Sequence, residues 1–370
     1  MNGQIMTIIA CSKCHKIYPN DQTPFQCECG GSFDYAEFPA YSDDLIDHST
    51  YGMTKYTRLF GLVQDFGLIT LGEGNTPLLS TTINGNEIFC KMESHNPTGS
   101  YKDRGSAVLV SFLNSRGVRF AVEDSSGNAG ASFAGYCARA GINARVYVPE
   151  SASGPKRMQI ERYGAELIQV PGPRREAANA VLKAANAGAV YASHAWMPFG
   201  LTGIATIAYE IVEQLGKVPE TLIAPVGHGG LLYGIMRGFE SMNKAGRIPH
   251  EPYYLGVQSC GCAPVVSAYS NSTRQISEVK LSETAAEGVK VSQPARGSSI
   301  LERMITGRGE MVAIEEGLLL DSWKESAKQG FYMEPTSALV WAAIKQNIKD
   351  FKTPVVAIIT GSGYKSIILS

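Results

Sequence analysis

The chain alternates short apolar runs with longer segments whose apolar positions recur at helical spacing. Short apolar runs bounded by polar residues and glycines predict buried strands, and 3.6-residue periodicity predicts amphipathic helices. The predicted strands are Glu87–Lys91, Val118–Val122, Arg145–Val148, Leu167–Val170, Thr221–Val226, Tyr253–Val257 and Pro354–Thr360. The predicted helices are Gly127–Ala140, Lys156–Tyr163, Arg174–Ala187, Leu201–Leu215 and Leu231–Met242. This alternation is typical of an α/β protein with parallel sheets and crossover helices.

Two regions depart from the alternation. Residues 270–300 are rich in Ser, Thr and Gln and predict an irregular surface excursion. The first 40 residues instead contain two close cysteine pairs, surrounded by glycines and aromatic residues. No internal repeat or low-complexity tract is present in the sequence.

The two cysteine pairs, Cys11 with Cys14 and Cys27 with Cys29, predict a zinc site. Four thiolates in two close pairs can surround one tetrahedral zinc ion, and so short a segment gains stability from a metal. The second pair has one intervening residue where a standard zinc knuckle has two, so His15 is a possible substitute ligand. The alternatives are a ribbon without metal or a disulfide.

Composition narrows the function classes. The 370 residues allow two domains and a small appendage, and 44% are hydrophobic, enough for a full core. A net charge of −1 favours neither nucleic acid nor an anionic membrane as partner, and residues 1–40 carry only Lys13 and Lys16 against four acidic residues. The sequence contains no apolar run long enough for a transmembrane helix and no signal-peptide pattern, so we expect a cytoplasmic protein.

One lysine is a candidate for covalent chemistry. Lys102 follows the loop Asn96–Tyr101 and precedes an apolar run of helical period. The positive end of a helix dipole disfavours a further positive charge, and a neutral amine is a nucleophile toward an aldehyde. The alternative is a surface lysine that opens a helix.

Three glycine- or hydroxyl-rich loops follow predicted strands. Ser125–Gly130 opens a helix and can form a nest of N–H groups for a carboxylate, although an ordinary capped helix start is the alternative. Gly227–Gly230 can approach an anion in the same way, with His228 either reaching that anion or facing solvent. Thr360–Lys365 ends the last strand and places the hydroxyl of Thr360 where it could face a ligand. The alternative is a glycine-rich turn that closes an edge of the sheet.

Together with Gly72–Leu78 and Glu334–Ala338, these strings resemble threonine synthases, which belong to the fold-type-II pyridoxal phosphate (PLP) enzymes. The resemblance implies that Lys102 carries PLP, that Asn128 bonds its phenolic oxygen and that Thr360 faces its pyridine nitrogen. It assigns the PLP phosphate to Gly227, His228, Gly229 and Gly230. It assigns the substrate to Ser125, Ser126, Gly127, Thr76 and Thr206. Pro335 is expected in the first turn of a helix, with Glu334 facing the cofactor or capping that helix.

The resemblance also implies how the chain is divided into domains. We expect a two-domain PLP fold of type II with parallel-rich twisted sheets and a small zinc-ribbon-like extension. The expected parts are residues 1–40 as the ribbon-like segment, 41–105 with 193–370 as the large PLP-binding domain, and 106–192 as a small mobile domain. The family further implies a homodimer that acts on a small-molecule amino acid.

One motif departs from the family. Threonine synthases show an arginine and a lysine for the substrate phosphate where this chain has Gly200 and Ala205. Losing a bidentate arginine removes a strong charge-assisted contact, although Lys156, Arg157, Arg162 or Arg104 could replace it. The absence of both cations favours an altered phosphate pocket or a different amino-acid substrate. The resemblance as a whole implies conversion of O-phosphohomoserine and water to L-threonine and phosphate, which is the leading function. The alternatives are β-replacement or β-elimination on serine or O-phosphoserine, with cysteate-synthase-like or dehydratase-like chemistry, or a non-catalytic PLP-binding or partner-binding protein.

Overall fold

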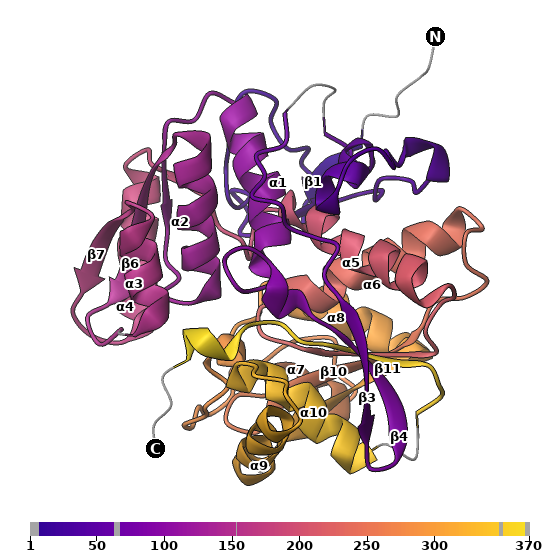
Figure 1. Ribbon diagram of the computed structural model, residues 1–370. Helices are drawn as coiled ribbons and strands as arrows, with labels where there is room; N and C mark the ends of the chain where they lie inside the picture. Colours follow the sequence, from indigo (N-terminus) through magenta and orange to yellow (C-terminus); the bar gives the residue numbers. More distant parts are fainter. Residues whose placement is uncertain (1–6, 63–66, 153, 348–350, 367–370) are drawn as a thin grey trace. The chain divides into compact units, whose positions relative to one another are not determined.

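The computed structural model describes residues 7–62, 67–152, 154–347 and 351–366 (Figure 1). The chain forms two compact units. The first comprises Met1–Gly74 and Lys102–Gly203, and the second comprises Asn75–Tyr101 and Ile204–Ser370. The first six residues of the predicted ribbon-like segment lie outside the described residues.

The first unit contains a parallel sheet with the strand order β7-β6-β5-β8. Its strands are β5 (Phe120–Glu123), β6 (Asn143–Pro149), β7 (Glu166–Val170) and β8 (Val190–Tyr191). Its helices are α1 (Lys102–Ser115), α2 (Asn128–Ala140), α3 (Pro155–Arg162) and α4 (Arg174–Asn186). Because β8 returns to pair with β5, the carboxyl ends of these two strands meet at one edge of the sheet. Several of the predicted site residues of this unit follow that edge.

The N-terminal segment of this unit packs through aromatic side chains. A short antiparallel pair, β1 (Ile9–Cys11) and β2 (Phe33–Tyr35), frames the cysteines. The Tyr18 ring lies edge-on to Phe33 at 4.8 Å and to Phe199 at 5.2 Å, between ring centroids. Phe199 in turn stacks on Phe112 of α1 at 3.5 Å. The ribbon-like segment thus contacts the helix that begins with Lys102.

The second unit contains a larger sheet with the order β11-β10-β9-β12-β4-β3, parallel except for the edge strand β3. Its strands are β3 (Leu78–Ile83), β4 (Asn86–Lys91), β9 (Thr221–Pro225), β10 (Tyr253–Ser259), β11 (Gly309–Ile314) and β12 (Val355–Ile358). Asn84 and Gly85 join β3 to β4 with positive φ angles of 49° and 79°, which suits a tight hairpin.

Helices cover this second sheet. They are α5 (Gly200–Leu215), whose start belongs to the first unit, α6 (Gly230–Lys244), α7 (Pro264–Ser270), α8 (Gly297–Arg303), α9 (Glu316–Lys328) and α10 (Pro335–Asn347). The core is built largely on α10, where the residues from Ala338 to Ile344 are fully buried against strand residues such as Ile223 and Ala357. No described helix has the length and apolar character needed to cross a membrane.

The α/β prediction with parallel-rich sheets is confirmed, and each predicted strand and helix has a counterpart. Strands β3, β8 and β11 were not predicted, because they are edge or very short strands with weak apolar patterns, and neither were α7, α8 and α9. Residues 270–300 are irregular as predicted, but the surface prediction is wrong for their second half. Ala286 and Val289 join the second unit's core, and Arg296 is 1% exposed. The predicted domain boundaries stay a prediction.

Candidate active site

Lys102 is the first residue of α1, as the sequence predicts, and its side chain is half-buried. The next two residues, Asp103 and Arg104, are fully buried. The Asp103 carboxylate accepts a 2.7 Å hydrogen bond from the hydroxyl of Ser132 on α2. This buried contact fixes the first turn of α1, and so fixes the base of the Lys102 side chain.

The Ser125–Asn128 loop connects β5 to α2 in the same unit. The Ser125 N–H donates to the Glu123 carboxylate at 2.5 Å, and the Gly127 N–H donates to the Ser125 hydroxyl at 3.2 Å. A Cβ on Gly130 would lie 1.8 Å from the Ser125 carbonyl oxygen, so only glycine permits this tight turn. The loop is therefore a compact, internally bonded structure at the helix start.

Glu123 and His194 meet beside this loop, and neither was predicted from the sequence. Glu123 ends β5 and is 1% exposed, and its carboxylate lies 2.5 Å from Nδ1 of the half-buried His194. Burial raises the pKa of Glu123 to about 7, against the opposing charges of Arg174 and Lys102 and the N–H of Ser125. Burial, reinforced by the charge of Lys102, holds the pKa of His194 well below its usual value. A neutral imidazole therefore faces a carboxyl group that titrates near neutrality.

The Gly227–Gly230 loop belongs to the second unit, between β9 and α6. Gly229 adopts a left-handed conformation with φ 92°, and a Cβ there would lie 2.8 Å from the Ile300 side chain. A Cβ on Gly227 would lie 2.8 Å from the carbonyl oxygen of Gly288, whereas one on Gly230 would meet nothing within 4 Å. The α6 N-terminus, with its N–H groups, therefore has open space beside Gly230.

Arg296 supports this loop from the segment that was predicted to lie on the surface. Its N–H donates to the carbonyl oxygen of His228 at 2.9 Å, and its Cβ would lie 3.1 Å from a Cβ on Gly229. The half-buried His228 is thus held through its backbone.

Thr360 follows β12 in the second unit and is 1% exposed. Its hydroxyl lies 2.9 Å from the Ser337 hydroxyl and donates to Glu334 at 3.2 Å. Ser337 also accepts the Gly361 N–H at 3.1 Å. Pro335 opens α10 as predicted. The Thr360 carbonyl accepts the N–H of Tyr101, the residue before Lys102, at 3.0 Å.

Thr76 and Thr206, the remaining predicted substrate residues, are both buried in the second unit. The Thr76 hydroxyl donates to Glu93 at 2.7 Å, and its carbonyl accepts from Lys91 at 2.7 Å. Thr206 lies on α5.

Gly200 and Ala205, which stand where threonine synthases have an arginine and a lysine, lie in close helix contacts. A Cβ on Gly200 would lie 3.1 Å from backbone atoms of Gly105 on α1. Ala205 is fully buried, and its carbonyl oxygen would lie 2.6 Å from a Cβ on Gly238 of α6. At Gly200 the space that a long cationic side chain would need is taken by the backbone of Gly105, and at position 205 the alanine side chain is fully buried.

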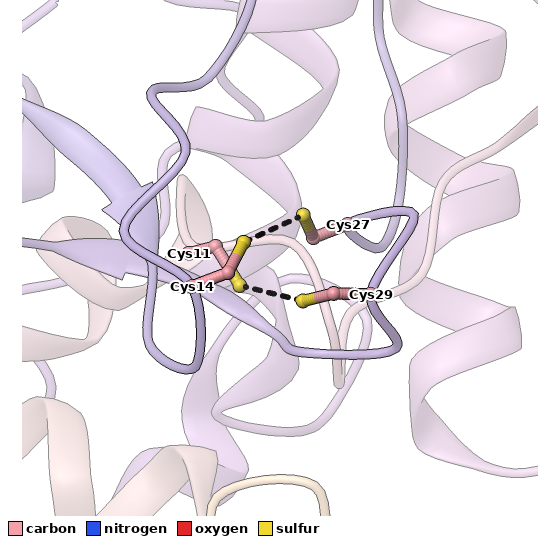
Figure 2. Close-up of side chains that lie close together, drawn as sticks. All are labelled: Cys11, Cys14, Cys27 and Cys29. Carbon is pink, nitrogen blue, oxygen red and sulfur yellow. Dashed lines mark hydrogen bonds between the residues drawn. The ribbon is translucent and has the colours of Figure 1, made fainter.

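The four cysteines of the predicted zinc site converge (Figure 2). Their sulfur atoms all lie within 4.8 Å of one another, with Cys11 and Cys29 at 3.5 Å and Cys14 and Cys27 at 3.6 Å. Zinc–sulfur bonds of about 2.3 Å in a tetrahedron place sulfurs about 3.8 Å apart. The arrangement therefore fits one zinc ion.

The thiols differ in acidity. Burial opposes ionisation of Cys11, but N–H groups of Cys14 and Lys13 and the neighbouring thiols lower its pKa to about 6. The Lys16 N–H favours the thiolate of Cys14, but the thiols of Cys29 and Cys27 outweigh it and raise the Cys14 pKa to about 12.

Comparison with known proteins decides the family. A family model for "Pyridoxal-phosphate dependent enzyme" matches residues 69–361, most of the chain. The chain belongs to this family.

Relatives within the family indicate which kind of PLP-dependent enzyme this chain resembles. Threonine synthase from Methanocaldococcus jannaschii is 34% identical over 373 residues, which cover 96% of this chain and 92% of the relative. Threonine synthase from Mycobacterium bovis is 32% identical over 313 residues, which cover 81% and 84% of the two chains. The protein is therefore a threonine synthase-like member of the PLP family and a PLP-dependent lyase.

Solved structures show the same fold. Maize serine racemase matches with a TM-score of 0.67 and 20% identity, covering 80% of this chain and 89% of that one. The processed form of threonine deaminase isoform 2 from Solanum lycopersicum matches with a TM-score of 0.67 and 20% identity, covering 80% of each chain. The PLP fold of type II is confirmed.

The predicted PLP-site residues divide between the two units. The first unit holds Lys102, Ser125, Ser126, Gly127 and Asn128, and the second holds Thr76, Thr206, Gly227, His228, Gly229, Gly230 and Thr360. No role at the site was predicted from the sequence for Glu123, His194, Arg296 and Ser337, although Ser337 lies in the Glu334–Ala338 string. Glu123 carried one sequence signal, since it precedes a hydroxyl-rich loop at a strand end, but its partner is 71 residues away.

Proposed function

We propose that this PLP-dependent lyase is a threonine synthase that converts O-phosphohomoserine and water into L-threonine and phosphate. The observation that supports the proposal is the sequence similarity to threonine synthase from Methanocaldococcus jannaschii, which extends over nearly the full length of both chains. In this reaction phosphate leaves Cγ of the substrate and water adds at Cβ.

Lys102 is the residue we assign to the aldehyde of PLP. Its place at the start of α1, with a buried anchor in Asp103, gives the amine a fixed base. When bound, PLP supplies stabilisation of negative charge on the carbons of the substrate. Lys102 would then take the proton from Cα and return protons to the carbons, which needs the amine within hydrogen-bond reach.

The second unit offers a fitting phosphate site. The left-handed Gly229, the N-terminus of α6 and the open space at Gly230 together suit a dianion held by main-chain N–H groups. We therefore assign the PLP phosphate to Gly227, His228, Gly229 and Gly230. We assign the pyridine nitrogen to the neutral hydroxyl of Thr360, which leaves that nitrogen mostly unprotonated.

The substrate carboxylate is assigned to the loop of Ser125, Ser126 and Gly127, with Asn128 bonding the phenolic oxygen of PLP. The tight turn at Gly130 and the bond from Gly127 to Ser125 preorganise this loop. Thr76 and Thr206 complete the proposed substrate residues. We keep the expected small mobile domain at 106–192, the cytoplasmic location and the homodimer as parts of this proposal.

One observation favours a second candidate function. The backbone of Gly105 lies where the arginine side chain of the family pattern would begin at Gly200, and Ala205, at the lysine position of that pattern, is fully buried. A β-substituted amino acid such as serine or O-phosphoserine needs no γ-phosphate site. The second candidate is therefore β-replacement or β-elimination with the same cofactor residues.

The experiment that separates the two functions is an assay of the purified protein with O-phosphohomoserine, O-phosphoserine, serine and threonine in turn. We expect phosphate and L-threonine from O-phosphohomoserine, and at least about 10-fold slower turnover of the others. Serine and threonine lack the phosphate, and O-phosphoserine carries it one carbon closer to Cα, so each is expected to lose at least one charge-assisted contact, which is worth about that factor. Turnover of O-phosphoserine or serine, without phosphate release from O-phosphohomoserine, would contradict the threonine synthase proposal and establish the second candidate.

We further propose that Cys11, Cys14, Cys27 and Cys29 hold a structural zinc ion. The purified protein is expected to contain about one zinc per chain. Cys27→Ala is expected to lose that zinc and to lower the melting temperature, because Tyr18 of the same segment packs on Phe199. Metal analysis and thermal unfolding measure both effects, with Cys260→Ala, an exposed cysteine of the second unit, as the control. Wild-type protein that lacks zinc after expression in zinc-supplemented medium would contradict the assignment.

A further inference from the structure

Glu123 and His194 form a hydrogen-bonded acid–base pair that the proposed roles do not use. One oxygen of the Glu123 carboxylate lies 2.5 Å from His194 Nδ1, and the other accepts the Ser125 N–H at 2.5 Å. Glu123 is 1% exposed, so water contributes little to its solvation. Ser125 opens the loop that we assign to the substrate carboxylate, so the pair contacts that loop directly.

The pair can change its charge without losing either hydrogen bond. When Glu123 is ionised, Nδ1–H of the neutral His194 donates to its carboxylate. When the pair takes up a proton at Nε2, the Nδ1 proton moves along the hydrogen bond to the Glu123 oxygen, and the new O–H donates to Nδ1. No bond between heavy atoms changes, and the pair gains one positive charge.

The charged groups around the pair come from three elements. Lys102 at the start of α1 and Arg174 at the start of α4 favour the ionised carboxylate of Glu123. Asp124, at the end of β5, carries the opposite sign and accepts a 2.7 Å hydrogen bond from the Tyr191 hydroxyl on β8. Burial and the charge of Glu123 raise the pKa of Asp124. Burial raises the pKa of Glu123 to about 7, so a small change in local charge alters its protonation near neutral pH.

We propose that Glu123 and His194 are a positioning pair that orders the Ser125–Asn128 loop and takes up one proton when an amino-acid carboxylate binds there. The proposal rests on the assignment of this loop to the substrate carboxylate. A second carboxylate near an ionised Glu123 is opposed by like-charge repulsion, and uptake of one proton removes that repulsion. Binding of the anion and protonation of the pair therefore favour each other.

The test uses the holoenzyme and L-alanine, which has the α-carboxylate and amino group but no leaving group. Its dissociation constant is measured from the cofactor absorbance between pH 6 and pH 8, in wild type and Glu123→Gln. Gln keeps the size of the side chain and an oxygen for the Ser125 N–H, but it does not ionise. With a titration near pH 7, the ratio of the wild-type to the variant dissociation constant is expected to rise about tenfold over this range.

A second variant and a second readout keep the test decisive. His194→Phe removes the donor to the ionised carboxylate, so the wild-type inflection is expected to move to higher pH. In holoenzyme with isotope-labelled histidine, the NMR signal of His194 is expected to titrate near pH 7 in wild type and to lose that step in Glu123→Gln. Exposed Glu161→Gln is the control and should match wild type.

The outcomes separate this proposal from the one on which it rests. L-alanine binding with the same pH dependence in wild type and Glu123→Gln would overturn the proton uptake while leaving the loop assignment intact. Absence of L-alanine binding to cofactor-loaded wild type, or unchanged binding in Ser126→Pro, would overturn the loop assignment and the pair's role together.

Discussion

Lys102→Ala is expected to lose the visible absorbance of the covalently bound cofactor and to lower kcat by at least about 10³-fold. The reason is that one amine has two tasks in the proposed reaction. It forms the covalent link to the PLP aldehyde, and it carries protons to and from the substrate carbons, a contribution worth about 10² to 10⁴ in rate. Absorbance spectra and the phosphate-release assay measure the two effects separately.

The control for this change is Lys183→Ala, because Lys183 is an exposed lysine on α4 of the same unit. It should retain the absorbance band and full activity. A Lys102→Ala protein that keeps both would contradict the assignment of the cofactor to Lys102. Circular dichroism of both variants establishes that the fold is unchanged.

Lys91→Met is expected to destabilise the second unit by about 3–5 kcal/mol, the cost of removing one partner from a buried ion pair. Lys91 is fully buried, and its ammonium donates to Glu210 at 2.7 Å, to Gln214 at 2.9 Å and to the Thr76 carbonyl at 2.7 Å. The other Glu210 oxygen accepts the Asn75 N–H at 2.7 Å. Without Lys91 the buried Glu210 carboxylate loses its ammonium partner.

Urea unfolding followed by tryptophan fluorescence measures this loss, because Trp323 and Trp341 both belong to the second unit. Exposed Lys324→Met on α9 is the matched control and should change the free energy of unfolding by less than about 0.5 kcal/mol. The double variant Lys91→Met with Glu210→Leu should recover part of the loss, since it leaves no unpaired charge. A cost below about 1 kcal/mol for Lys91→Met would show that water or a rearranged side chain replaces the ammonium.

The local features of the candidate site could be predicted from the sequence because they depend on neighbours in the chain. Lys102 opens α1, the Ser125–Asn128 loop leads into α2, and Gly229 precedes α6. In each case a glycine- or hydroxyl-rich turn comes directly before a run of helical period. Short-range patterns of this kind contain the information needed to place a helix start.

The pairings across the fold could not be predicted in the same way. Glu123 and His194 meet only because β8 returns beside β5, which brings together residues 71 positions apart. The Ser337–Thr360 contact and the support of His228 by Arg296 likewise depend on tertiary structure. A surface position was predicted for Arg296 because its segment has a polar composition. The tertiary structure nevertheless buries this residue.

The close packing of α5 against α1 at Gly200 is a further feature that could not be predicted from the sequence. The sequence shows that the arginine of the family pattern is missing, but only the structure shows that backbone atoms of Gly105 lie 3.1 Å from where a Cβ would be. A larger side chain at this position would require α5 and α1 to separate. The missing arginine is therefore linked to helix packing.

Every role proposed for the active site depends on Lys102 carrying the cofactor. Reduction of the PLP-loaded protein with borohydride, followed by proteolysis and mass spectrometry of the pyridoxyl-labelled peptide, locates the attachment directly. We predict one labelled residue, Lys102, in the peptide that contains Asn96–Arg104. A label on another lysine, or protein that binds PLP and yields no labelled peptide, would contradict this assignment.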